Sequence, residues 1–192
     1  MKPILILYAT REGQTRRIAE HLAATARTRG FEADVIRVNK IPAGFSLDSY
    51  SAAVLAASVH LHKHEPEMMK FVTNNLASLE RMPTVFLSVS LSEAGAEDPS
   101  ASPERRAQSA ADAEEMIQAL LEETGWHPRH IRAIAGALMY SKYNFVVRFV
   151  MKRIARQAGA PTDSSRDYEF TDWEALDRIL DELTSDLAPP GN

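Results

Sequence analysis

One short stretch restricts the fold of this chain more than any other. It is the uncharged run Ile4 to Ala9, which is followed at once by the polar turn Thr10 to Thr15. A continuous, mainly aliphatic run of this kind is typical of a strand that is buried in a parallel sheet. In an open α/β sheet, ligands bind at the carboxyl ends of such strands. We therefore expect residues 10–15, called the ligand loop below, to bind a ligand.

The chemistry of the ligand loop favours an anion. A helix that begins near Gln14 would direct its first, unpaired backbone N–H groups and the positive end of its dipole toward the loop, which suits a phosphate. Thr10 and Thr15 would add hydroxyl donors, and Arg11 would add a positive charge. Gly13 would let the backbone approach the ligand closely. The loop has neither a Walker A sequence nor the Gly-x-Gly-x-x-Gly pattern, so a mononucleotide phosphate is the better match. The alternative is an ordinary turn that caps a helix.

Length and composition limit the possible classes of protein. The 192 residues, 45% of them hydrophobic and 25% charged, predict one globular domain over residues 1–187, with a frayed tail at 188–192. The absence of cysteine excludes disulfides, thiol catalysis and thiolate metal sites. No apolar run approaches the roughly 18 residues of a membrane span, and the first strand begins too early for a signal peptide. With a net charge of −4, we expect a cytoplasmic protein that does not bind nucleic acid.

The rest of the chain alternates predicted strands with predicted helices. Strands are expected over 31–38, 52–57, 83–91 and 131–138, helices over 14–29, 65–79, 104–123 and from 172 onward, and a loop over 92–103. This alternation predicts a doubly wound, five-stranded parallel sheet in the flavodoxin-like order 2-1-3-4-5. After or within the fifth strand the pattern is interrupted by about residues 139–165, called the insertion below. Within the insertion a helix is predicted over about 144–157. Residues 166–170 are candidates for a return to the sheet.

The third predicted strand ends in a histidine-rich segment. His60, His62 and His64 would share one face if this segment were extended, which is a possible zinc arrangement. Nothing else at this edge of the sheet suggests a fourth ligand, so we expect no metal. The favoured interpretation is that His60 lines a pocket and that the other two histidines are solvated.

The insertion is strongly basic. Residues 139–160 include five lysines and arginines and no acid. At helical spacing, Phe145 and Phe149 share an arc with basic residues that include Lys152 and Arg153. Such a face suits an anionic membrane or an anionic aromatic substrate, whereas the alternative is a core helix with solvated charges. Tyr140 and Tyr143 lie close to the ligand edge and are candidate pocket residues.

Five segments in this order resemble the flavodoxin superfamily, and more closely its branch of menaquinone-dependent protoporphyrinogen IX dehydrogenases. They are Leu7 to Thr15, Ala57 to Val59, Ser88 to Leu91, Ala135 to Tyr143 and Tyr168 to Glu174. The resemblance covers nearly the whole chain.

The resemblance implies FMN as the cofactor, a porphyrinogen as the reduced substrate and a quinone as the electron acceptor. Carried over by position, it implies that the FMN phosphate and ring are held by three segments: Thr10, Arg11, Glu12, Gly13, Gln14 and Thr15; Ala57, Ser58, Val59 and His60; and Ser88, Val89, Ser90, Leu91 and Ser92. It further implies that the insertion faces substrate, quinone or membrane.

The expected function is therefore an FMN-dependent oxidoreductase that passes electrons from a reduced substrate to a quinone. Flavin suits this reaction because it accepts electrons in pairs and releases them in one- or two-electron steps. His60 is a candidate for handling protons, because imidazole exchanges protons near neutral pH. Two alternatives remain: an FMN electron carrier or quinone reductase that docks a basic partner through Glu93, Glu97 and Asp98, and a module that has lost the flavin.

Overall fold

The computed structural model describes residues 2–145, 148, 149, 152, 155, 162–185 and 187. The predicted tail at 188–192 lies outside these residues. The single-domain boundary at residue 187 and the limits of the insertion remain predictions. Among the described residues, no helix is both long enough and apolar enough to span a bilayer.

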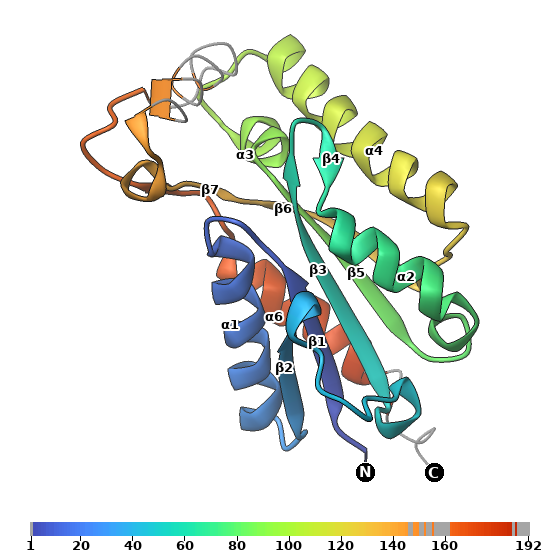
Figure 1. Ribbon diagram of the computed structural model, residues 1–192. Coiled ribbons are helices and arrows are strands. Elements are labelled where there is room, and N and C mark those ends of the chain that lie inside the picture. The colour runs from blue at the N-terminus through green and yellow to red at the C-terminus, as the bar shows by residue number, and fades with distance from the viewer. Residues whose placement is uncertain are drawn as a thin grey trace.

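The centre of the molecule is a parallel sheet in the order β2-β1-β3-β5-β6 (Figure 1). Its strands are β1 (Ile4–Ala9), β2 (Ala33–Arg37), β3 (Ala52–His60), β5 (Thr84–Ser90) and β6 (His130–Ala135). A short strand, β4 (Lys63–His64), pairs with β3 in an antiparallel hairpin. Once this hairpin strand is set aside, the order is the predicted flavodoxin-like order, so the predicted fold is confirmed.

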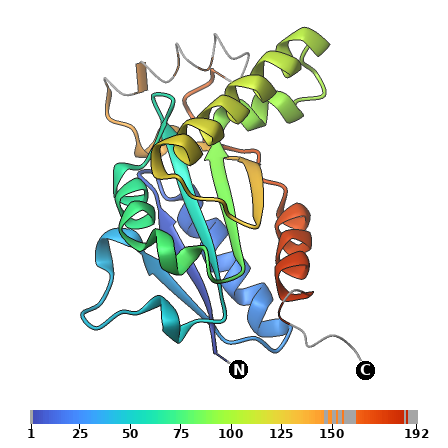
Figure 2. The ribbon, with the colours of Figure 1, turned by 90° about the vertical axis from the view of Figure 1, so that its right-hand side faces the viewer.

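Helices cover both faces of the sheet (Figure 2). They are α1 (Gln14–Thr28), α2 (Pro66–Leu79), α3 (Leu91–Glu97), α4 (Pro103–Thr124) and α6 (Trp173–Ser185). Two short 3-10 helices, η1 (Val38–Lys40) and η2 (Leu47–Ser49), occupy the segment between β2 and β3. The helices α1, α2, α4 and α6 agree with the predicted pattern.

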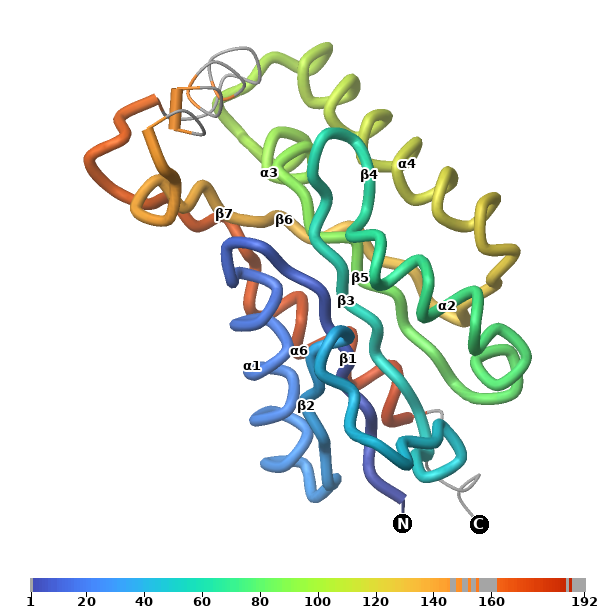
Figure 3. The backbone as a smooth tube through the Cα atoms, in the orientation of Figure 1, coloured from blue at the N-terminus to red at the C-terminus, as the bar shows by residue number. Residues whose placement is uncertain are grey.

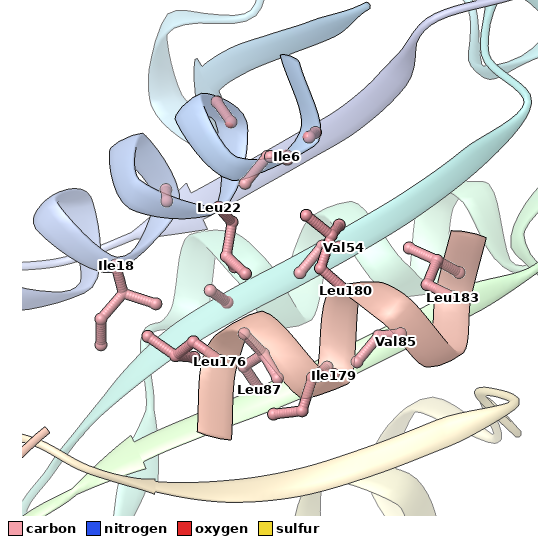
Figure 4. Close-up of a cluster of buried hydrophobic side chains, with 14 of the residues drawn as sticks. Ile6, Ile18, Leu22, Val54, Val85, Leu87, Leu176, Ile179, Leu180 and Leu183 are labelled. Carbon is pink, nitrogen blue, oxygen red and sulfur yellow. The ribbon is translucent and has the colours of Figure 1, made fainter. Parts of the chain in front are cut away.

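Alternate residues of the buried strand β1 contribute to two separate hydrophobic cores. Ile4 and Ile6 pack with α1 and α6, as Figure 4 shows for Ile6, Leu22 and Leu180. Leu5 and Leu7 pack with α2 and α4 on the other face. Because side chains alternate across a strand, a run that is apolar at every position must be covered on both faces. Helices therefore hold the central strands of the sheet from both faces, and the carboxyl ends of these strands are where the fold places a ligand.

The prediction of a loop over residues 92–103 is wrong in part. Residues Leu91–Glu97 form α3 instead, although their composition is polar and contains a glycine. The Ser90 hydroxyl caps this helix by accepting from the Glu93 N–H at 3.1 Å. Ser and Glu three residues apart are typical of a helix start, and this local signal outweighs the composition.

The fifth strand also differs from its prediction. It ends at Ala135, and after Gly136 the chain forms β7 (Ala137–Leu138), which leaves the parallel sheet. This strand pairs antiparallel with β8 (Tyr168–Glu169) to form a separate two-stranded sheet. The predicted return at 166–170 therefore does not rejoin the main sheet. Between the two strands lies η3 (Tyr140–Lys142), and the tube in Figure 3 shows this segment beyond the carboxyl ends of β1, β3 and β5.

Candidate functional site

A pocket opens at the carboxyl ends of β1, β3 and β5. The residues that line it are Thr10, Glu12, Gln14, Thr15, Ser58, Val59, His60, Val89, Ser90, Leu91, Gly136, Ala137 and Tyr143. All of them except Gly136, Ala137 and Tyr143 belong to the predicted cofactor residues, and Tyr143 was a predicted pocket residue. The three predicted segments therefore meet at one place.

The ligand loop has a fixed conformation that begins the helix α1. Gly13 has a φ of 103°, which is strained for residues with a side chain, and it occupies the N-cap position. Its N–H donates to the Thr10 hydroxyl at 3.0 Å, and its carbonyl accepts from the Arg17 N–H at 3.2 Å. The loop is thus held by its own backbone and by Thr10. The N–H groups of the first helical turn face the loop, as an anion site requires.

Thr15 provides the clearest sign that the loop binds something. Its side chain is completely buried, yet its hydroxyl oxygen has no hydrogen-bond partner among the described residues. A buried hydroxyl without a partner costs roughly 1–3 kcal/mol. An oxygen atom of a phosphate group in the loop would accept this hydrogen bond and remove the cost. The residues present therefore fit a phosphate-bearing cofactor.

The first turn of α1 is also tied to the strand β8. The Gln14 amide donates to Glu169 Oε1 at 3.1 Å and to the Thr171 hydroxyl at 2.9 Å. Arg17 donates to Glu169 Oε2 at 2.8 Å, and the Thr171 hydroxyl donates to the carbonyl of Ala135 at 2.7 Å. The ligand loop is therefore connected directly to the segment that follows the insertion.

One wall of the pocket contains an imidazole between two carboxylates. His60 Nε2 lies 3.0 Å from Glu12 Oε2 and 3.3 Å from Glu65 Oε1, although neither contact has hydrogen-bond geometry. Glu65 is 3% exposed; it accepts from the Ser58 hydroxyl at 3.1 Å and pairs with Arg11 at 3.1 Å. The wall is therefore negatively charged near His60, and the arrangement can take up and release a proton.

Five predicted cofactor residues do not line the pocket: Arg11, Gly13, Ala57, Ser88 and Ser92. The Arg11 side chain pairs with Glu65 instead of lining the pocket, because the buried carboxylate of Glu65 needs a cationic partner. Ala57 is buried in the core between α2 and the sheet. Ser92 lies in the first turn of α3.

The interpretation of the three histidines was wrong in part. Leu61 and His62 form the tip of the β3–β4 hairpin with φ values of 50° and 60°, so the segment reverses and the three rings cannot share one face. His62 is exposed, as expected. His64, however, is buried and lies 2.9 Å from the Ser88 hydroxyl, and its burial lowers its pKa to about 4. The described residues contain no group of three or more His, Asp or Glu side chains that could hold a metal ion.

The two tyrosines that follow β7 have different surroundings. Tyr143 lines the pocket, and its burial, together with the charge of Glu12, raises its pKa to about 12. Tyr140 does not line the pocket. It is buried with Leu138 and packs edge-to-face against Tyr143, with 5.9 Å between the ring centroids. Tyr140 therefore supports Tyr143.

The described part of the insertion is partly helical and presents two aromatic rings to solvent. Phe145 is 85% exposed and Phe149 is 68% exposed. Lys152 is partly exposed, and Ala155 is buried beside the tyrosines. Arg153, the remaining predicted residue, lies outside the described residues. The alternative of a core helix, in which these phenylalanines would be buried against a neighbour, is therefore wrong.

Sequence reasoning missed Gly136, Ala137, Glu65 and Glu169 at this site. Gly136 allows a close backbone contact, because a Cβ atom there would lie 3.3 Å from the carbonyl oxygen of Ser90. A glycine inside an apolar strand is a known sign of such a contact. Glu65 and Glu169, which hold the walls of the pocket, gave no local signal, because their partners are distant in the sequence.

Comparison with known proteins identifies the family. The family model described as the flavodoxin domain matches residues 5–165. The chain belongs to the flavodoxin domain family. A flavin is the cofactor that this family and fold imply, and the pocket described above stands where the fold places a ligand, at the carboxyl ends of the strands.

The chain is also similar to individual proteins. The chain is 32% identical over 179 residues to the protoporphyrinogen IX dehydrogenase (quinone) of Escherichia coli strain K12, with 93% of each chain covered. It is 26% identical over 182 residues to the Leishmania major protein of the same name, with 94% of this chain and 74% of that protein covered. The crystal structure of oxidised flavodoxin 1 from Bacillus cereus has a TM-score of 0.54 at 16% identity, covering 97% of this chain and 99% of that chain. This last likeness supports the fold alone.

Proposed function

We propose that this chain is an FMN-dependent oxidoreductase that oxidises protoporphyrinogen IX and passes the electrons to a quinone. The buried, unpartnered hydroxyl of Thr15 in the ligand loop is the observation that carries the cofactor part of the proposal. The named activity of the relatives, which align with 93% of this chain in the case of the Escherichia coli protein, supports the choice of substrate and acceptor.

In this proposal the pocket residues divide the work of binding FMN. The first turn of α1 and the hydroxyls of Thr10 and Thr15 hold the phosphate. Residues from the ends of β3 and β5, including Val59 and Val89, line the space for the ring. When bound, the flavin supplies a two-electron acceptor, and the protein supplies binding, orientation and electrostatics.

His60 is the proposed proton-handling residue. Its imidazole faces the pocket between Glu12 and Glu65, so Nε2 is placed to accept a proton released during oxidation of the substrate. We expect His60→Ala to lower turnover by about 100-fold, within the range for general acid–base catalysis, while flavin content stays the same. Unchanged turnover in His60→Ala would remove this role.

The experiment that tests the proposal combines a spectrum with an assay. The purified chain is mixed with excess FMN, desalted and examined by visible absorbance, and then supplied with protoporphyrinogen IX and menaquinone under anaerobic conditions. We expect retained flavin and a rate of protoporphyrin formation well above that of free FMN. Retained flavin without porphyrinogen oxidation would leave an FMN electron carrier or quinone reductase as the function. A colourless protein would point to the flavin-free module.

One observation bears on the electron carrier. Its docking site was expected at Glu93, Glu97 and Asp98, but Glu93 is partly buried in α3, and burial raises the pKa of both glutamates. Glu97, however, is exposed, and hydrogen bonds with Ser100 lower the pKa of Asp98, so these two carboxylates remain available to a basic partner. The named activity of the relatives is what favours the dehydrogenase over the carrier.

We further propose that the protein lies on the cytoplasmic side of an anionic membrane and contacts it peripherally. Among the described residues, the exposed large hydrophobic side chains are Leu61, Phe145 and Phe149. Both Figure 1 and Figure 2 show the β3–β4 hairpin and the segment after β7 at the same end of the molecule. Basic residues with exposed aromatic rings are a combination that binds anionic lipid surfaces.

Sedimentation with vesicles of phosphatidylglycerol and phosphatidylcholine tests the membrane contact. We expect Phe149→Asp to reduce the bound fraction severalfold. Ala77→Asp is the control, because it adds the same charge at an exposed position of α2. Equal binding of the two variants would contradict the contact.

A further inference from the structure

Charge is distributed unevenly around the pocket. The wall formed by the ligand loop and the end of β3 carries the carboxylates of Glu12 and Glu65. Tyr143 also lines the pocket, and the chain beyond it is basic, with five cationic residues and no acid over 139–160. An anionic group on a bound molecule would therefore be repelled from the His60 wall and attracted toward the insertion.

One cation of the insertion reaches the rim of the pocket. Arg148 Nη2 donates to the backbone carbonyl of Tyr143 at 3.3 Å, and the side chain of Tyr143 lines the pocket. The Nε atom of Arg148 is buried and has no hydrogen-bond partner, and among the described residues Arg148 forms no ion pair. The guanidinium group thus retains unused donors close to the pocket. Such a group prefers a planar carboxylate, which it can contact through two donors at once.

The helical spacing of the described insertion residues supports the same orientation. Arg148, Lys152 and Ala155 follow one stripe at intervals of four and three residues. Ala155 is buried in a cluster with Tyr140 and Tyr143, so this stripe borders the body of the molecule, while Arg148 and Lys152 stay partly exposed.

Arg148 is better placed to bind a ligand than its neighbour on the stripe. Lys152 already acts on a carboxylate, because its charge contributes to lowering the pKa of Asp163. Phe145 and Phe149 are exposed and remain available to the membrane contact proposed above. Arg148 combines partial burial, unused donors and contact with a pocket residue.

We infer that Arg148 binds a carboxylate of the substrate and thereby orients it in the pocket. This inference rests on the proposed function, because protoporphyrinogen IX carries two propionate groups. When a propionate is bound to Arg148, the edge of the tetrapyrrole that carries the propionates lies toward the insertion. An edge without propionates then faces the flavin side of the pocket, and the negative charges stay away from Glu12 and Glu65. Arg148 is thus a specificity-determining residue for the dicarboxylate, whereas His60 acts on the proton.

The test compares a substrate that has carboxylates with one that lacks them. The FMN-loaded full chain is assayed with protoporphyrinogen IX and with its dimethyl ester in the same detergent, with menaquinone as acceptor. We expect Arg148→Gln to raise KM for the diacid about tenfold with little change in kcat, because a charged hydrogen bond is lost. The KM for the ester should not change. Arg148→Lys should recover part of the affinity, and Arg81→Gln, which removes an exposed cation beyond the far end of α2, should behave as wild type.

A binding measurement that requires no turnover separates this inference from the proposed function. Protoporphyrin IX, the oxidised and stable dicarboxylate, is titrated into the FMN-loaded wild type and Arg148→Gln, and its dimethyl ester serves as the comparison. Weaker binding of the diacid alone to the variant supports the inference even if no porphyrinogen is oxidised.

Three results would overturn the inference. In the first, wild-type turnover is normal and the variant has an unchanged KM for the diacid. In the second, KM rises equally for the diacid and the ester. In the third, vesicle binding falls in Arg148→Gln while KM does not, which would assign this cation to the membrane. Failure of the wild type both to oxidise porphyrinogen and to bind protoporphyrin would remove the proposed function together with the inference.

Discussion

The ligand loop and the insertion meet at one pocket but are built in opposite ways. Thr10, Gln14 and Thr15 are buried, and the loop is held by its own backbone and by Thr10. The insertion exposes Phe145 and Phe149 and carries most of its charge as cations. The ligand loop is therefore defined by local backbone geometry, whereas the insertion relies on charge and exposed surface. Substitutions near the loop should change FMN binding or protein stability, and those on the outer face of the insertion should change neither.

The largest expected effect concerns His64, which is buried at the end of the β3–β4 hairpin against Ser88 of β5. Its pKa falls from 6.5 to about 4 on folding because of burial. Between pH 4 and pH 6.5 the unfolded chain therefore binds more protons at His64 than the folded chain does. The contribution of neutral His64 to the unfolding free energy is complete above pH 6.5 and is lost as the pH falls toward 4. The loss should amount to about 3 kcal/mol.

Urea unfolding of the wild type and His64→Asn from pH 4 to 7 measures this contribution. We expect a shallower decline of the unfolding free energy in the variant. His62→Asn, at the exposed tip of the same hairpin, should decline like the wild type. Parallel curves for all three proteins would mean that His64 is solvated in solution.

The second effect tests the ligand loop itself. Thr15→Val keeps the size and branching of the side chain and removes the unpartnered hydroxyl. If this hydroxyl donates to the FMN phosphate, its loss should weaken FMN binding by about 10- to 100-fold, as expected for a hydrogen bond to a charged group. Flavin fluorescence titration measures the affinity. Thr28→Val, at the exposed end of the same helix, is the matched control, and equal affinities in the two variants would contradict the phosphate site.

Local sequence signals predicted some features of the fold and of the site, and they failed for others. The strand order and the ligand loop were predictable because periodicity, the aliphatic run of β1 and the glycine before α1 are local signals. The β3–β4 hairpin was not, because its tip is Leu61-His62 rather than a glycine- or asparagine-bearing turn. As a result, the burial of His64 against Ser88 could not be foreseen.

Glu169 joins the two regions, and its replacement should have a smaller effect. Glu169→Gln removes the charge that pairs with Arg17 at 2.8 Å while keeping an acceptor for Gln14. Because both partners are partly exposed, the pair should contribute less than about 1 kcal/mol, so FMN affinity should fall about threefold. Glu182→Gln breaks a comparable pair with Arg132 and serves as the control. Identical titrations for both variants would show that β8 does not influence the loop.

The same residue illustrates what remained unpredictable at the site. Glu169 and Gln14 are 155 positions apart, and no spacing rule connects them. Glu65 likewise contacts Arg11 across 54 positions. Local patterns indicate which loops meet at a sheet edge, but the partners of individual carboxylates depend on tertiary packing.

The smallest effect is expected on the outer face of the insertion. The double substitution Phe145→Ser and Phe149→Ser removes side chains that are exposed to solvent, so the unfolding free energy should change by less than about 0.5 kcal/mol. FMN affinity should stay within twofold of the wild type. Thermal unfolding and flavin titration measure both quantities. A clear loss of stability would mean that these rings are buried in solution and that the contrast between the two regions is wrong.

The most direct test of the central claim is the anaerobic assay of the FMN-loaded chain with protoporphyrinogen IX and menaquinone. We predict a yellow protein that forms protoporphyrin at a rate dependent on both the bound flavin and the quinone. A protein that retains no FMN after desalting, or one that retains FMN but forms protoporphyrin no faster than free FMN does, would contradict the claim.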